Sequence, residues 1–515
     1  MESELEKVLD IAGHGRYNIM VLLVSSTIHL ASILDLLGFC VIVPAAACDL
    51  KLGMREISLL TSIPFAGYLS ALPWGYYVDT HGRRKAILIS TSVGAVFATL
   101  TTFSTSFTMM LVLKLLGCLF STASITLSIT YLGECTGTRN RTRYLLILNC
   151  FNLISDFICY ALAYLILGLQ FEIPLPWLAI TFRPWRLLTL VMAVMLAVGG
   201  FVIFFLHESP KFLATKGRVD EALEVMKTGY GLKDRDVDLV KSLLTVTKDT
   251  GNERKLPFMM SLWQQTAPIF SRPYLMKTLQ LFFLLAVCTS TNNVFYIWFP
   301  TIVNSFYNAP SNATASFCDK ITSNITADVH LGETCNDVIA DNTIFSGMAF
   351  SLFFTIINYI ASMITSWRKS VLVGTLLISG MSTVVVDLVE QPVISLLLFI
   401  LIQLVGLSAG NVASYFVDVY PTSFRGLSTS LGSMFARMTV MVGINIVGST
   451  IVQHCRATFL SWSIFVFVGM VVACFLPKET TTTRNPLFYG RCSNCIKKWL
   501  KVTQPTGSTR TMTCA

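Results

Sequence analysis

Charged side chains are scarce in this sequence. Asp, Glu, Lys and Arg make up 13% of the 515 residues, about half of the share that is usual in soluble globular proteins. Because 53% of the residues are hydrophobic, a water-soluble fold would lack the polar surface that it needs. Apolar runs such as 86–113 and 186–206 reach the length of about 20 residues that a bilayer-spanning helix requires. The composition therefore predicts a polytopic membrane protein.

The motifs of most enzyme classes are also missing. The sequence has no Gly-rich phosphate loop, no acidic metal cluster and no nucleophile–base arrangement. We therefore expect no enzymatic activity, no ATP site, no metal and no cofactor. Cys492 and Cys495 form a CxxC pair without a second pair, which favours lipidation over metal binding. The first residues lack the short apolar core of a signal peptide, so we interpret the first span as an uncleaved anchor.

Hydropathy predicts an all-α fold with twelve transmembrane helices in two pseudo-symmetric six-helix bundles. The expected spans are residues 18–47, 57–78, 86–106, 108–132, 143–169, 185–206, 275–303, 342–366, 370–388, 392–416, 427–453 and 457–476. The expected divisions are a cytoplasmic N-terminus 1–17, a first bundle 18–206, a cytoplasmic connector 207–274, a second bundle 275–476 with a long loop 305–341, and a cytoplasmic tail 477–515. A helix is expected over Val219–Thr228 of the connector.

Basic residues predict the orientation. Arg83 and Arg84 follow the second span, Arg139 precedes the fifth and Arg368 follows the eighth. Since Lys and Arg concentrate in cytoplasmic loops, both termini are expected in the cytoplasm. The formal charge of +9 then reflects this bias and a basic tail, and we expect no nucleic-acid partner.

The acidic loop 305–341 is expected on the opposite, extracytoplasmic side. Asn312 and Asn324 begin Asn-x-Thr sequons and are candidate glycosylation sites. Cys318 and Cys335 are the two cysteines of this loop, and an oxidising compartment favours a disulfide between them over two free thiols.

The two halves repeat each other. Two patterns recur, Phe-x4-Pro at 39–44 and 295–300, and an acid separated from an Arg by six residues at Glu134/Arg141 and Asp418/Arg425. Parallel halves of this kind are a transporter design in which the solute binds near the midplane.

The loop after the second span resembles the signature of the major facilitator superfamily through Gly75, Asp79, Gly82, Arg83 and Arg84. Gly75 is interpreted as a site of close helix packing. The resemblance implies the major facilitator fold. We expect these five residues to form a cytoplasmic gate together with the repeated pairs Glu134, Arg141, Asp418 and Arg425.

Three further stretches sharpen the resemblance. Residues 207–213 and 420–426 are similar to segments of sugar porters, organic ion transporters and synaptic vesicle glycoprotein 2 relatives. Trp298 and Pro300, with residues 13–17, favour the synaptic vesicle glycoprotein 2-like branch.

Ionisable residues inside the bilayer are costly and mark function. The candidates for substrate binding or coupling are Asp35, Lys114, Asp156 and Arg437, together with Asn152, Asn292, Asn293, Tyr296, Trp298 and Asn411. The alternative for each charged residue is a buried pair that holds helices together. Asp35 and Lys114 are expected to approach each other in the outer half of the first bundle and to act as a proton- or solute-linked switch, as resemblance to proton-coupled sugar porters implies.

These observations predict a secondary active or facilitative transporter of a small polar or charged organic solute, working by alternating access. Its expected partners are that solute, protons as a candidate coupling ion, and membrane lipids, and it is expected to be a monomer. The expected location is the plasma membrane or an intracellular vesicle membrane. The alternative is a non-transporting vesicle or surface membrane protein that acts in binding or trafficking.

Overall fold

The computed structural model describes residue 9 and residues 15–178, 180–231, 266–272, 274–308, 316–322, 339–363, 368–420 and 422–476. The helices of the N-terminal half are α2 (Arg16–Leu37), α3 (Phe39–Ala45), α4 (Met54–Ala66), η1 (Gly67–Ser70), α5 (Ala71–His81), α6 (Arg83–Thr102), α7 (Phe107–Cys135), α8 (Thr138–Leu167), α9 (Pro184–Val202) and η3 (Ile203–Phe205). The helices that follow are α10 (Pro210–Thr215), α11 (Val219–Thr228), η6 (Ala267–Phe270), α14 (Leu275–Asn308), α16 (Asp341–Met363), α17 (Arg368–Val385), α18 (Pro392–Ile402), η8 (Gln403–Gly406), α19 (Leu407–Val419) and α20 (Thr422–Cys474).

The described helices account for the twelve expected spans. Ten stretches of the described residues are long and apolar enough to cross a membrane. The last of these, Leu427–Cys474, has 48 residues and contains two crossings, because His454 leaves the helical conformation with φ −135° and ψ 46°. The 23-residue α16 supplies the remaining span.

Three of the described spans are interrupted along their length. Gly38 separates α2 from α3, and a Cβ there would lie 2.6 Å from the Met192 sulfur. The 3₁₀ turns η1 and η8 interrupt the second and tenth spans. Irregular backbone at membrane depth is tolerated where it is buried in protein or lines a cavity.

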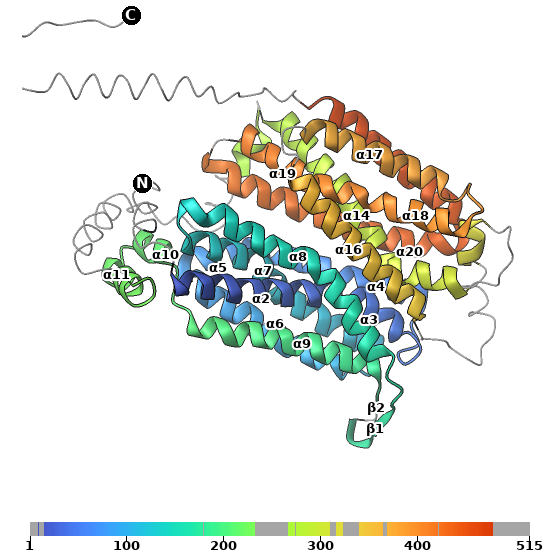
Figure 1. Ribbon diagram of the computed structural model, residues 1–515, viewed down its shortest axis with the longest axis horizontal. Coiled ribbons are helices and arrows are strands. Elements are labelled where there is room, and N and C mark those ends of the chain that lie inside the picture. Colours follow the sequence, from blue (N-terminus) through green and yellow to red (C-terminus); the bar gives the residue numbers. More distant parts are fainter. Residues whose placement is uncertain are drawn as a thin grey trace, which may run out of the picture. The chain divides into compact units, whose positions relative to one another are not determined.

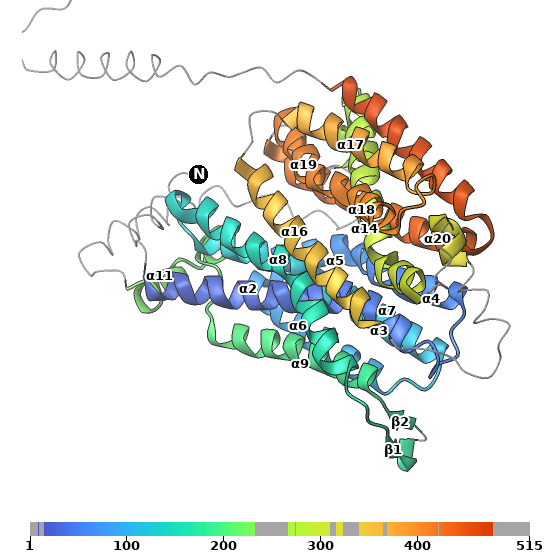
Figure 2. The same cartoon turned by 45° about the vertical axis from the view of Figure 1, so that its right-hand side comes forward.

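The N- and C-terminal halves lie side by side (Figures 1 and 2). They pack through α4 against α20, α8 against α16, and α3 against α14. Asn445 of α20 donates to Ser62 Oγ of α4 at 2.8 Å. A Cβ on Gly448 would lie 2.5 Å from Ser58 Cβ, so glycine permits this close approach of the two halves.

The two ends of the bundle are named here by their chemistry. The basic end carries Arg83, Arg84 and Arg368, which begin or closely follow the starts of α6 and α17. The disulfide end carries Cys318 and Cys455, which form a disulfide with a Cα–Cα distance of 5.7 Å.

This disulfide corrects the expected pairing of Cys318 with Cys335. Cys455 follows the break of α20 at His454, and that sharp turn between two spans brings it to the short helix 317–322. Sequence proximity within the loop was therefore a poor guide, because the partner comes from 137 residues away. Cys335, Asn312 and Asn324 lie outside the described residues. Cys48 is disulfide-bonded as well.

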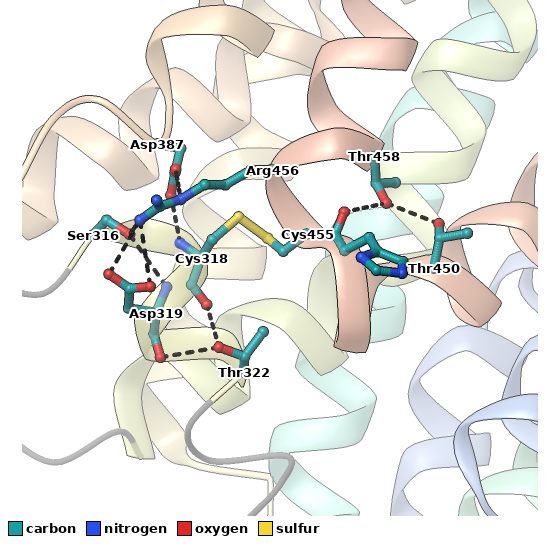
Figure 3. The surroundings of a disulfide bond; sticks show 10 residues. Ser316, Cys318, Asp319, Thr322, Asp387, Thr450, Cys455, Arg456 and Thr458 are labelled. Carbon is teal, nitrogen blue, oxygen red and sulfur yellow. Dashed lines mark hydrogen bonds and ion pairs between the residues drawn. A yellow bond between two sulfur atoms is a disulfide. The ribbon is translucent and has the colours of Figure 1, made fainter.

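Charge reinforces the disulfide. Figure 3 shows Arg456 reaching from α20 toward Asp319 and Asp387. Its Nε lies 2.8 Å from Asp387 Oδ2, while Asp387 Oδ1 accepts from the backbone N–H of Cys318 at 2.9 Å. These contacts join the helix 317–322, the turn after α17 and the break of α20 into one cap.

A short β-hairpin departs from the expected all-helical fold. Strands β1 (Ile173–Leu175) and β2 (Ile180–Phe182) pair antiparallel between α8 and α9, with Ile173 opposite Phe182. Pro174 and Pro176 disfavour a helix in this segment, and β-branched residues favour extended backbone.

The connector packs on the basic end of the N-terminal half. The helix expected at Val219–Thr228 is present as α11. The hydroxyl of Tyr230 donates to the carbonyl of Cys135, the last residue of α7, at 2.6 Å. Burial raises the pKa of the Tyr230 phenol well above its usual value, so it remains a neutral donor.

Candidate solute-binding cavity

A cavity of about 660 Å³ lies between the two halves. Its walls come from α2, η1, α7 and α8 on one side, and from α14, α16, η8, α19 and α20 on the other. Six residues selected from the sequence line it: Asn152, Asp156, Asn292, Asn293, Tyr296 and Arg437. A volume of this size suits a small organic molecule.

Asp156 is the carboxylate of the cavity wall. It lies on α8, and its Oδ1 accepts a hydrogen bond from the hydroxyl of Tyr296 on α14 at 3.0 Å. This bond joins the N-terminal half to the C-terminal half. The phenol is a neutral donor. Among the described residues, no cation is ion-paired with Asp156.

Arg437 supplies the positive charge of the wall. It lies on α20, and its Nη1 donates to Asn293 Oδ1 at 3.4 Å, a long bond. Its guanidinium carbon lies 5.0 Å from the ring centre of Tyr68 and 5.9 Å from that of Phe65, both in the N-terminal half. Cation–π contacts of this kind stabilise a charge without neutralising it.

Two of the polar candidates are elsewhere. Trp298 is buried against α20 and donates from Nε1 to the carbonyl of Ile444 at 3.2 Å. Asn411 is not among the residues that line the cavity in the described part of the chain. Both lie on helices that also carry lining residues.

Sequence reasoning missed seven polar residues of the described lining: His29, Tyr68, Asn149, Thr289, Ser351, Thr355 and Asn358. Asn149 precedes Asn152 by three positions on α8, a spacing that places both on one face of a helix and could have been noticed. His29 also has a packing contact within its own half: its Nδ1 lies 3.2 Å from the Ile125 carbonyl of α7. The same nitrogen lies 3.1 Å from the Ser128 hydroxyl, so both contacts hold the ring against α7.

Asp35 and Lys114 meet as expected, away from the lining of the cavity. Lys114 Nζ lies 2.6 Å from Asp35 Oδ1 and 2.7 Å from the Asp35 carbonyl oxygen. Ser121 donates to the second carboxylate oxygen at 2.9 Å, and the ammonium stands 4.6 Å from the ring centre of Phe39. The pair is buried and joins α2 to α7 within one half.

A charge network lies at the basic end of the N-terminal half. Arg83 Nε lies 2.9 Å from Glu134 Oε2, and Arg83 Nη2 lies 3.3 Å from Asp79 Oδ1. Ser209 of the connector donates to the same Glu134 oxygen at 2.8 Å. Arg141 donates to the Thr136 carbonyl at 3.4 Å.

Glu208, which belongs to the motif at 207–213 but was given no role from the sequence, is a central residue of this end. Its Oε1 accepts from the backbone N–H groups of Arg83 at 2.8 Å and Arg84 at 2.9 Å. These are the first residues of α6, so the carboxylate satisfies free donors at a positive helix terminus. Gly82 has φ +106°, and a Cβ there would lie 2.4 Å from Glu208 Oε2; both facts require glycine.

Gly75 does not have the packing role expected of it. A Cβ at this position would meet no atom within 4 Å, because α5 is exposed along most of its length and buries only Val78. The matching network of the C-terminal half joins Arg368 to Asp418 at 3.2 Å and to Ser414 at 2.8 Å. The side chain of Arg425 lies outside the described part of the chain.

The family model of the Major Facilitator Superfamily matches residues 26–318. The chain belongs to this superfamily. Its fold, two six-helix bundles around a cavity, is the one expected from the sequence. Superfamily membership favours a membrane solute transporter over a non-transporting binding or trafficking protein.

The chain is also similar to synaptic vesicle proteins, which confirms the branch that the motifs favoured. It is 23% identical to the synaptic vesicle 2-related protein of Xenopus laevis over 487 residues, covering 92% of this chain and 81% of the relative. It is 24% identical to human synaptic vesicle glycoprotein 2C over 375 residues, or 68% of this chain and 50% of the relative.

Solved structures share the fold. The E. coli xylose transporter in an inward-open conformation gives a TM-score of 0.63 at 11% identity, covering 90% of this chain and 98% of that structure. An inward-facing bacterial homologue of the human lysosomal transporter Spinster gives 0.62 at 12% identity, with coverage of 90% and 97%.

Proposed function

We propose that this member of the superfamily is a secondary active or facilitative transporter of a small polar or charged organic solute, and that the solute binds in the cavity between the halves. The observation that carries the proposal is the cavity itself, which takes polar and charged side chains from both halves. A site at the interface is exposed alternately when two halves rock against each other.

The packing supports a conformation that opens toward the basic end. Contacts between the halves at the other end include Asn445 with Ser62 and the ring pair Tyr164–Phe345. The ion pairs found at the basic end each join residues of a single half. Ile129, which lines the cavity and is 40% exposed, lies roughly 8 Å along α7 from Glu134.

Uptake into proteoliposomes tests the proposal. Purified protein should accumulate or equilibrate at least one solute from a panel of labelled sugars, organic cations and organic anions, with saturation. Protein-free liposomes are the control. Saturable binding without any transmembrane movement would instead support a binding or trafficking protein.

We propose the cytoplasm as the location of the basic end and of both termini, in a plasma or vesicle membrane. The basic residues of that end support this orientation. Glycosidase treatment should lower the apparent mass of the mature protein, and replacing both Asn312 and Asn324 should abolish the shift. A shift that required Asn140, which begins a third sequon, would contradict this orientation.

For the charge networks of the basic end we propose a gate role. In an outward-open state, Glu134 and Asp418 would come together with basic residues of the opposite half and close this end. Glu134→Gln with Asp418→Asn should then increase the labelling of thiols introduced at the basic end. Unchanged labelling would contradict the gate.

Proton coupling is proposed for the Asp35 and Lys114 pair. Separation of a buried carboxylate from its ammonium favours proton uptake by the carboxylate. Uptake measured against pH should lose its pH dependence in both Asp35→Asn and Lys114→Met. Unchanged rate and pH dependence would leave the pair as packing.

A further inference from the structure

The charge balance of the cavity identifies a class of solute. Among the described lining residues, Asp156 and Arg437 are the side chains that carry a full charge at neutral pH in water. One is negative and belongs to the N-terminal half, and the other is positive and belongs to the C-terminal half. The wall is therefore neutral in sum but charged at two places.

Neither charge is saturated by protein. A carboxylate offers about four acceptor positions, and Asp156 accepts one hydrogen bond, from Tyr296. A guanidinium offers five N–H donors, and Arg437 makes one long hydrogen bond, to Asn293. Asp35 shows the contrast, because both of its carboxylate oxygens have partners within 2.9 Å.

The two charges do not neutralise each other. No ion pair joins Asp156 to Arg437 in the described structure, so more than 4.0 Å separates their charged atoms. A charge facing a low-dielectric cavity without a counter-ion is costly. A solute with one charge would compensate one of the two and leave the other facing an occupied site from which water has been displaced.

We infer that the transported solute is dipolar, with a cationic group that binds Asp156 and a carboxylate or similar anionic group that binds Arg437. This inference rests on the proposed transport function and names its substrate class. Amide side chains of the same lining, from Asn152, Asn292 and Asn358, would bind polar atoms of the segment that connects the two charged groups.

The inference also links binding to conformational change. Because each half supplies one of the charges, a dipolar solute compensates both when it bridges the halves. Occlusion is then favoured by the complete solute and not by fragments that carry a single charge. The distance between the two charged groups of the best solute should report the separation of Asp156 and Arg437.

Aminocarboxylates of increasing length provide the test. Binding to the full-length protein in detergent would be measured by thermal stabilisation with β-alanine, 4-aminobutyrate, 6-aminohexanoate and glycine betaine. Butylamine, butyrate and xylose are the cationic, anionic and neutral probes. At least one dipolar probe should bind roughly 10-fold more tightly than butylamine and butyrate.

Variants assign each group to its partner. Asp156→Asn should weaken the best dipolar probe about 10-fold or more while leaving butyrate binding in place. Arg437→Gln should weaken the same probe comparably while leaving butylamine binding in place. Glu221→Gln and Arg218→Gln remove an exposed ion pair of the connector and serve as matched controls, which should bind as the parent does.

The outcomes separate the solute class from the transport function. If xylose or a singly charged probe is bound and taken up as well as any dipolar probe, and neither cavity variant changes this, the dipolar class is wrong and transport stands. If no probe of any class binds or crosses the membrane, the transport function itself is contradicted.

Discussion

Two carboxylates of the N-terminal half, Asp35 and Asp156, occupy membrane-spanning helices and have opposite surroundings. Asp35 is buried with a cation and a hydroxyl donor from α7 of its own half. Asp156 lines a cavity and meets one neutral phenol from the opposite half. A charge that is matched within one half contributes to holding that half together, whereas a charge at the interface of the two halves remains available to a ligand.

Lys114→Met should produce the largest loss of stability. It leaves the Asp35 carboxylate buried without its counter-ion, which typically costs about 3–5 kcal/mol. The free energy of unfolding in detergent, followed by tryptophan fluorescence, measures the effect. The double variant Asp35→Asn with Lys114→Met should recover part of the loss, and a single variant as stable as the parent would contradict the pair's structural contribution.

Ser121→Ala should have an intermediate effect. Its hydroxyl donates to Asp35 Oδ2 at 2.9 Å, and removing a partner from a buried charged group costs about 1–3 kcal/mol. The same unfolding experiment applies. Thr130→Ala on α7 is the control, because its hydroxyl bonds to its own helix and is exposed, so its loss should change stability by about 0.5 kcal/mol or less.

Asp156→Asn should have the smallest effect on folding and a large one on uptake. Removing an unmatched charge from the cavity wall relieves a cost, so stability should hold or rise by about 1 kcal/mol. Tyr296→Phe should cost about 0.5–1.5 kcal/mol in the parent and less in the Asp156→Asn background. Equal costs in both backgrounds in this double-mutant cycle would show that the hydrogen bond is unimportant.

The sequence predicted which ionisable residues lie in the membrane better than it predicted which side chains surround them. Asp35 and Lys114 could be paired in advance because helix rise gives the depth of a residue in the membrane. By contrast, Asp156 lines the cavity and Trp298 and Asn411 do not, and this difference depends on which face of each helix turns inward. Along α14, which carries Trp298, polar and apolar residues are not segregated on opposite faces, so its sequence gives little indication of that rotation.

The disulfide shows the same limit at the other end of the molecule. Cys318 was correctly expected in a bond, but its partner Cys455 was not, because pairing depends on distance in space. The break at His454 and the ion pairs of Arg456 with Asp319 and Asp387 bring these segments together. None of these contacts has a local sequence signal.

By itself, the sequence determined that the chain inserts into a membrane, that it forms helical spans in two related halves, and that it belongs with the major facilitators, because these properties follow from apolar length, charge bias and local motifs. The tertiary structure alone decided which polar residues share the cavity and which are buried in packing. The reason is physical: burial and charge compensation arise from helix rotation and from the approach of residues such as Asp156 and Tyr296, which are 140 positions apart.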